Sequence, residues 1–221
     1  MTARKKQYRL NDNTIDEIAA MKLPFSSKQY YAFTEKYLPK SVDEALYIDD
    51  DSTYYREIAT DYDDLKLLQF VRQYIAGSFL CDVGCGIGNV LHFAAMLGYT
   101  AFGYDINTGL RRIHKRLTVD VLYGDLLSMG LTRMADANVI YLYRPIGDDK
   151  LMNRLLARIH RHTGPETMVI YNYPHTTAIR GYETIVLSKY DAHIILLVKT
   201  GARIQDKILA RCELLSSPKK G

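Results

Sequence analysis

Cysteine is scarce in this 221-residue sequence, and long apolar runs are absent. Cys81, Cys85 and Cys212 are three in number, so we expect reduced thiols and not the disulfide framework of a small secreted domain. No apolar run approaches the roughly 20 residues that cross a bilayer. The basic start MTARKKQYRL is not followed by the apolar segment of a signal peptide. These absences predict a cytoplasmic protein that does not bind a membrane.

A strong charge of one sign is also missing. The net charge of +4 permits an acidic partner without requiring one. Histidine, cysteine and acidic residues form no cluster with the spacing of metal ligands, so we expect no metal. The content of hydrophobic residues (48%) and charged residues (24%) is that of a globular protein, and the length suits one domain with some additions.

Short apolar runs recur at regular intervals from about residue 78 onward. Each run is too short for an independent helix, and we interpret each as a strand. The seven runs are SFLCDV, TAFGYD, VDVLY, ANVIYLY, TMVIYNY, YETIVLSKY and DAHIILLVKT. Helical periodicity between them predicts helices over Gly88–Leu97, Thr108–Arg116, Leu126–Arg133 and Asp148–His162. The alternation predicts a parallel sheet covered on both faces, with the last two runs as an antiparallel hairpin at the sheet edge.

The first 77 residues have a different character. Helical spacing is found over Ile15–Met21, Lys28–Tyr37 and Tyr54–Ile75, and we expect these segments to pack on the α/β core. The predicted organisation is therefore a helical extension (1–77), an α/β domain (78–200) and a C-terminal tail (201–221).

Three glycines, Gly84, Gly86 and Gly88, directly follow the first predicted strand and begin a predicted helix. Glycine permits positive φ there and lets a ligand lie against bare backbone. The second strand ends in Asp105 about 20 residues further on, as a nucleotide-like binding site requires. A dinucleotide fingerprint, GxGxxG, would need a glycine where the chain has Asn89. The spacing GxGxG therefore disfavours a nicotinamide cofactor.

The segment DVGCGIG, Asp82 to Gly88, resembles the first motif, D-x-G-x-G-x-G, of the class I S-adenosylmethionine-dependent methyltransferases. The resemblance covers about residues 78–200 and implies a Rossmann-like three-layer sandwich with a seven-stranded, mostly parallel sheet. The physical chemistry agrees with it. A dinucleotide presents a pyrophosphate to a helix N-terminus, whereas S-adenosylmethionine carries a sulfonium and an ammonium, which suit the carboxylate of Asp82.

The same resemblance implies which residues bind S-adenosylmethionine. They are Asp82, Gly84, Cys85, Gly86, Gly88, Tyr104, Asp105, Ile106, Asp125 and Leu126. Asp105 would accept hydrogen bonds from the ribose hydroxyls, and Tyr104 and Ile106 would pack against the adenine. Asp125 would contact the adenine amine. A helix N-cap is the alternative role for Asp125, and the two roles are compatible.

Methyl transfer requires above all that the nucleophile be held in line with the activated methyl carbon. A general base is needed only if the nucleophile arrives protonated. In the family the fourth strand ends at the methyl donor, and here that end reads YLYRPI. Tyr143 and Arg144 are therefore candidate acceptor-site residues, with a packed strand end and a solvated side chain as their simpler alternatives. His175, after the fifth strand, is the histidine we would test as a base.

The acceptor itself stays open among proteins, nucleic acids and small molecules. The Asp/Asn-Pro-Pro-Tyr/Phe motif of amino methyltransferases and the Pro-Cys nucleophile of cytosine C5 enzymes are both missing, which disfavours those two classes. Nine acidic residues over Asp43–Asp64 favour a basic partner, and the basic clusters Arg111–Arg116 and Arg154–Arg161 favour a nucleic acid, unless all are solvated faces. The alternative to an enzyme is a regulatory subunit that binds the cofactor without catalysis.

Overall fold

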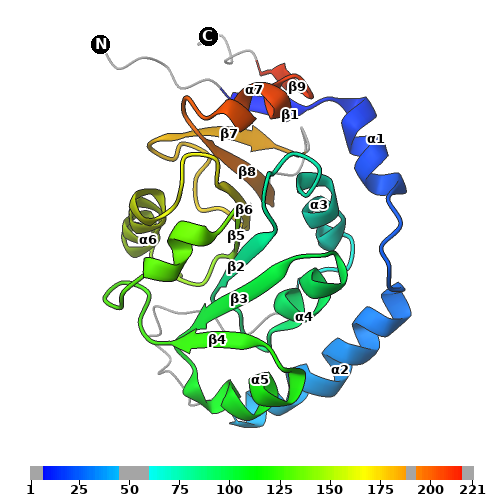
Figure 1. The fold of residues 1–221 in the computed structure, drawn as a ribbon, viewed down its shortest axis with the longest axis vertical. Helices are drawn as coiled ribbons and strands as arrows, with labels where there is room; N and C mark the ends of the chain where they lie inside the picture. Colours follow the sequence, from blue (N-terminus) through cyan, green and yellow to red (C-terminus); the bar gives the residue numbers. More distant parts are fainter. Residues whose placement is uncertain (1–6, 45–59, 188–192, 216–221) are drawn as a thin grey trace.

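A nine-stranded sheet forms the centre of the protein, in the order β4-β3-β2-β5-β6-β8-β7-β1-β9 (Figure 1). The computed structural model describes residues 7–44, 60–187 and 193–215. The strands are β1 (Gln7–Leu10), β2 (Phe79–Val83), β3 (Thr100–Asp105), β4 (Asp120–Tyr123), β5 (Val139–Tyr143), β6 (Met168–Asn172), β7 (Tyr182–Val186), β8 (Ile194–Lys199) and β9 (Cys212–Leu214). Strands β2 to β6 are parallel, and β8 is antiparallel to both of its neighbours. The Rossmann-like α/β fold and the antiparallel pairing of the last two predicted strands are confirmed.

The expected number of seven strands is wrong, because both ends of the described chain add a strand at one edge. β1 pairs in parallel with β7, and β9 pairs antiparallel with β1. The hairpin of β7 and β8 is therefore not at the edge of the sheet. The segment placed in a C-terminal tail contains helix α7 (Arg203–Leu209) as well as β9. Strands of four and three residues carry too little alternation to be recognised, and only distant pairing stabilises them.

The helices cover both faces of the sheet. They are α1 (Asp12–Ala20), α2 (Ser27–Glu44), α3 (Asp64–Val71), α4 (Asn89–Met96), α5 (Arg111–Leu117), α6 (Asp149–His162) and α7, with 3-10 turns η1 (Thr108–Leu110) and η2 (Thr132–Asp136). The helix predicted over Leu126–Arg133 is wrong. The Asp125 carboxylate accepts the backbone N–H of Leu127 at 2.8 Å, and this side-chain bond stabilises a turn there.

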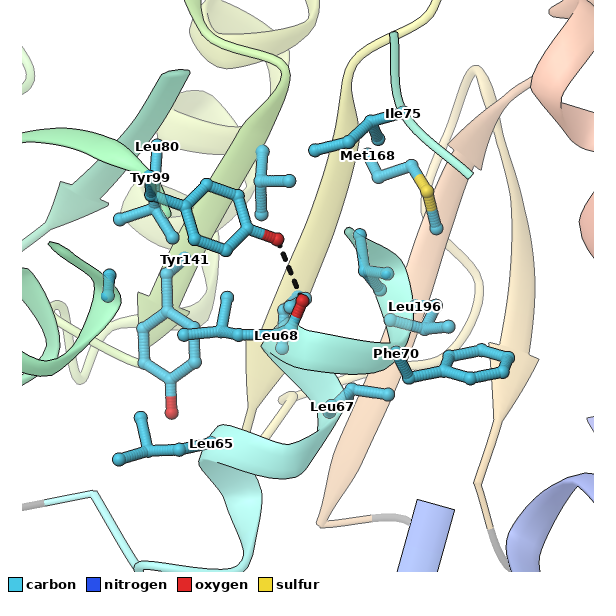
Figure 2. Packing of buried hydrophobic residues seen from close by; sticks show 14 of the residues in the cluster. Leu65, Leu67, Leu68, Phe70, Ile75, Leu80, Tyr99, Tyr141, Met168 and Leu196 are labelled. Atoms are coloured by element: carbon cyan, nitrogen blue, oxygen red, sulfur yellow. Dashed lines mark hydrogen bonds between the residues drawn. The ribbon is translucent and has the colours of Figure 1, made fainter. Parts of the chain in front are cut away.

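Helix α3 shows how the first face of the sheet is covered. Its residues Leu65, Leu67, Leu68 and Phe70 are all buried in the largest apolar cluster (Figure 2). The hydroxyl of Tyr99 donates to the carbonyl oxygen of Leu68 at 2.8 Å and fixes the helix against β3. Of the predicted helix Tyr54–Ile75 only α3 forms among the described residues, and 54–59 lie outside them. Most of the acidic stretch Asp43–Asp64 lies outside them as well.

Helix α6 covers the opposite face. Asp148 caps its N-terminus by accepting the backbone N–H of Leu151 at 2.8 Å, and basic residues occupy its last turn, where they complement the helix dipole. Its buried stripe is Met152, Leu155, Leu156 and Ile159, at helical spacing. Within the parts of the chain that the structure describes, every helix is too short or too polar to cross a membrane.

Candidate cofactor and acceptor site

The glycine loop turns sharply at the carboxyl end of β2. Gly84, Gly86 and Gly88 have φ angles of 80°, 50° and 79°, in the region that favours glycine. A Cβ on Gly84 would lie 2.6 Å from the Cβ of Pro145, which follows β5. Gly88 is the residue directly before α4. The loop is thus a turn with positive φ at all three glycines and a close contact at Gly84, as the motif predicts.

Two buried carboxylates lie at the ends of the strands beside this loop. Asp82 is 3% exposed and Asp105 is 6% exposed. Asp105 accepts the backbone N–H of Gly86 at 2.7 Å and that of Asn107 at 2.7 Å, so it ties the loop to the end of β3. Burial, and then the nearby Asp105, raise the pKa of Asp82 well above its ordinary value. A cation bound here would offset both effects, so these residues fit the ammonium and sulfonium of S-adenosylmethionine.

A histidine that was not among the predicted site residues contacts the backbone of the glycine loop. His114, 2% exposed in α5, places Nε2 2.7 Å from the carbonyl oxygen of Gly86 and Nδ1 2.5 Å from the hydroxyl of Tyr123. A carbonyl only accepts, so Nε2 carries the proton and the neutral ring accepts the Tyr123 O–H at Nδ1. Burial lowers the pKa of His114 and so favours this neutral form. The pair Tyr123–His114 fixes the position of the Gly86 carbonyl.

The remaining residues expected to bind the cofactor differ in their placement. Cys85 and Leu126 are buried at the loop and after β4, and Ile106 is half-buried beyond β3. Tyr104 is 1% exposed inside the second apolar cluster beside Phe102, so the structure does not bring its ring to the loop surface.

The Asp125 carboxylate holds the turn after β4, where it accepts Leu127 N–H and the Ser128 hydroxyl at 2.8 and 2.9 Å. Its role as a cap is therefore present, although the capped element is a turn and not a helix.

The three candidate acceptor-site residues fall on opposite faces of the sheet. Tyr143 packs against the first cluster, on the face of α3 and α4. Arg144 lies on the side of α6, where it donates to Asp149 at 3.0 Å and to the Gly147 carbonyl at 3.2 Å. His175 is held by Tyr171 through an O···Nδ1 contact of 2.9 Å. The charge of Arg144 acts on His175, so the structure brings these two residues near each other but leaves Tyr143 on the other face.

Tyr143 is instead one of three rings at the carboxyl ends of β5 and β6. Its ring centroid is 5.2 Å from that of Tyr173, which in turn is 5.9 Å from that of His193. The backbone N–H of Tyr173 also donates to the His193 carbonyl at 2.5 Å. We call Tyr143, Tyr173 and His193 the aromatic wall.

A chain of buried hydrogen bonds connects the start of α4, next to the glycine loop, with the region of the aromatic wall. It runs through Asn89, Tyr30, Thr60, Tyr141, Asn172 and Asp64. The Asn172 amide is its junction, since Nδ2 donates to the Tyr141 hydroxyl at 2.7 Å and to Asp64 at 3.2 Å. An Oδ1 of Asp64 is 3.9 Å from Nε2 of His193.

Asp64, at the end of this chain of hydrogen bonds, has a strongly shifted pKa. Burial raises its pKa to about 6, against an opposing effect of His193 and a supporting one of Asp61. Asp64, Asn172 and His193 were not among the site residues predicted from the sequence. The available signal was Asn172, an amide that ends the otherwise apolar strand MVIYN.

Comparison with known proteins identifies the fold. No family model and no curated protein sequence matches this chain. Among solved structures, the chain is similar to the S-adenosylhomocysteine-bound methyltransferase PaMTH1 from Podospora anserina, with 8% identity, a TM-score of 0.56, and coverage of 86% of this chain and 97% of that one. A candidate caffeoyl-CoA O-methyltransferase from Staphylococcus aureus gives 14% identity, a TM-score of 0.56, and coverage of 85% and 97%. The chain therefore has the fold of the S-adenosylmethionine-dependent methyltransferases.

Proposed function

We propose that this chain binds S-adenosylmethionine at the glycine loop and transfers its methyl group to an acceptor at the carboxyl ends of β5 and β6. One observation carries the proposal: three positive-φ glycines lie between two buried carboxylates, Asp82 and Asp105, on adjacent parallel strands. Ligands of open α/β sheets bind at the carboxyl ends of the strands, which is where this arrangement lies.

Each residue then has a definite task. Asp82 binds the ammonium of the cofactor's amino-acid part, because a positive charge near a buried carboxylate stabilises the ionised form of that carboxylate. Asp105 binds the ribose hydroxyls while it keeps its hydrogen bond to Gly86, so ligand binding and loop position depend on one carboxylate. Ile106, Leu126 and Asp125 border the adenine side.

Bound S-adenosylmethionine supplies a methyl carbon that its sulfonium already activates. The chain itself has to place the acceptor atom in line with that carbon and to exclude water, and such positioning contributes up to roughly 7–11 kcal/mol to lowering a barrier. Val83, before Gly84, pairs with Leu142, before Tyr143, so the cofactor loop and the aromatic wall start from adjacent strand ends. Arg144, tied to Asp149, holds the turn between β5 and α6.

Titration calorimetry tests the cofactor. We expect S-adenosylhomocysteine and S-adenosylmethionine to give saturable heats, and NAD to give none. Binding of NAD in place of both would contradict the proposal. Transfer of a labelled methyl group into a fractionated cell extract then tests the reaction. Cofactor binding without transfer to protein, nucleic acid or small molecules would indicate a non-catalytic regulatory subunit.

A further inference from the structure

The acceptor side of the site has an exposed aromatic surface. Tyr173 exposes 45% of its surface, although both other rings of the aromatic wall are close to it. Its ring centroid is 5.2 Å from that of Tyr143 and 5.9 Å from that of His193. An exposed ring that adjoins a half-buried tyrosine and an imidazole offers stacking and edge contacts to another aromatic ring.

The backbone is strained directly after the two strands that end at this surface. Tyr173 has a φ of 50° and Arg144 a φ of 35°, and they are two of three non-glycine residues with positive φ in the described parts of the chain. Both directly follow the strands, β6 and β5, whose ends form the acceptor side. Backbone of this kind persists where the surrounding structure holds it, and it is concentrated at functional sites.

A proton-accepting pair adjoins the aromatic wall. Nε2 of His193 is 3.9 Å from Oδ1 of Asp64, and the side chain of His193 is 39% exposed whereas that of Asp64 is 11% exposed. The Asn172 amide holds the other carboxylate oxygen at 3.2 Å. Asp61 and Asp63 precede α3, and Tyr141 and Tyr143 face the pair from β5. The Asp64 carboxylate thus lies beside an imidazole that itself reaches the surface.

We infer that the methyl acceptor is a neutral aromatic compound with a phenolic hydroxyl, that it stacks on the ring of Tyr173, and that His193 is the general base which takes its proton. This inference rests on the proposed function. Acidic neighbours disfavour an acceptor that is already an anion, and an aryl amine, which is neutral near pH 7, would attack through its lone pair with no base needed before the attack. A phenol needs the base that this surface provides.

The proposed step balances as follows. The phenolic oxygen forms a bond to the methyl carbon, and the carbon–sulfur bond of the donor breaks with its electron pair passing to sulfur. The phenolic proton moves to Nε2 of His193, where the Asp64 carboxylate stabilises the imidazolium. The products are an aryl methyl ether, S-adenosylhomocysteine and a proton, which His193 later releases to water.

A phenol whose ionised form is coloured, 4-nitrophenol, tests this without turnover. We expect it to bind the complex of the protein with S-adenosylhomocysteine, and its phenolate band to grow at a pH where the free phenol is mostly protonated. His193→Ala and His193→Gln should keep S-adenosylhomocysteine binding but lose the band, and Tyr173→Ala should weaken binding of the phenol about three- to tenfold. The matched controls are His162→Ala in α6 and Phe79→Ala at the start of β2, which should behave as wild type.

Activity gives the second readout. With labelled S-adenosylmethionine and simple phenols, both His193 variants should lower kcat about 10²- to 10⁴-fold and remove the acidic limb of the pH–rate profile. Asp64→Asn should retain that limb. Normal S-adenosylhomocysteine binding with no phenol bound, or unchanged transfer by the His193 variants, would overturn this inference and leave the proposed function intact. Loss of cofactor binding by the wild-type protein would overturn both.

Discussion

The cofactor side and the acceptor side of this site are built in opposite ways. The centre of the cofactor side comes from one continuous stretch, Asp82 to Asn107, in which a strand, a glycine turn, a helix and a second strand follow one another, and the next strand of the chain adds Asp125 and Leu126. The acceptor side draws its residues from the start of α3, the ends of β5 and β6, and the start of β8. Residues 64 and 193 meet there only because β8 inserts between β6 and β7. Local order thus determines cofactor geometry, whereas sheet order determines acceptor geometry.

The two sides also use different chemical devices. The cofactor side relies on backbone, with glycine φ angles and N–H groups held by Asp105. The acceptor side relies on side chains that titrate or stack, and on strained non-glycine backbone at Tyr173. We therefore expect substitutions on the cofactor side to weaken or abolish cofactor binding, and those on the acceptor side to alter rate or stability while cofactor binding persists.

The largest effect should come from Gly84→Ala. The alanine backbone would have to keep the positive φ of this position, which costs roughly 1–3 kcal/mol. Its methyl group would also lie 2.6 Å from the Cβ of Pro145, and this overpacking adds roughly 1–3 kcal/mol. We expect no detectable S-adenosylhomocysteine binding by calorimetry and a lower melting temperature. Gly98→Ala is the matched control, because Gly98 has the same φ of 80° and nothing within 4 Å of the added Cβ. An equal fall in melting temperature in the two variants would show that backbone strain alone destabilises the protein and that the contact with Pro145 does not contribute.

Asp105→Ala should have the next largest effect. It removes a charged acceptor worth roughly 1.5–3 kcal/mol in a hydrogen bond, so the dissociation constant of S-adenosylhomocysteine should rise from about tenfold to more than a hundredfold. Calorimetry measures the change. Asp120→Ala on the adjacent strand β4, whose carboxylate is 59% exposed and pairs with Arg133, should leave the affinity unchanged. If the affinity of Asp105→Ala were within threefold of the wild-type value, Asp105 would not be part of the binding site.

These two predictions depend on residues that the sequence already indicated. The DVGCGIG motif and Asp105 could be recognised because their chemistry follows from neighbours within one supersecondary unit. The order of strands and helices could be recognised for the same reason. The edge strands could not, since Leu10 is the only fully buried residue of β1 and its partner β7 is more than 170 residues away in sequence, as the register of Gln7 with Thr184 shows.

The catalytic candidates show the limit of the same reasoning. Tyr143 and Arg144 are adjacent in sequence and were therefore predicted to lie in one site, but consecutive residues at a strand end face opposite sides. The histidine chosen as a base, His175, lies with Tyr171 on the α6 side. The histidine beside Asp64 is His193, and its neighbourhood depends on an antiparallel insertion that no short motif encodes.

On the acceptor side, Asp64→Asn should change the pH dependence of the protein's stability. The native pKa of Asp64, about 6, exceeds the ordinary value of 3.8, so the folded state holds this proton more tightly than the unfolded chain. Wild-type stability therefore falls as pH rises from about 4 to about 6, and stays reduced above that. We expect the free energy of unfolding of Asp64→Asn at neutral pH, measured by urea denaturation, to exceed that of wild type by on the order of 1–2 kcal/mol. Below a pH of about 4 the two should be equally stable. A variant less stable at neutral pH would contradict burial as the dominant cause of the raised pKa.

The smallest effect should come from Tyr123→Phe, and it tests whether the support beneath the loop reaches the cofactor. The change removes only the hydroxyl that donates to Nδ1 of His114, and the ring stays under Arg111, whose guanidinium is 4.8 Å from its centroid. A neutral hydrogen bond contributes about 0.5–1.5 kcal/mol, so the dissociation constant of S-adenosylhomocysteine should rise about two- to tenfold. Tyr99→Phe is the matched control, because it removes another buried hydroxyl, the donor to the Leu68 carbonyl, away from the loop. Both variants should melt at lower temperature, but only Tyr123→Phe should lose affinity. An equal affinity loss in both would mean that the cofactor side responds to general destabilisation, and that His114 does not position Gly86.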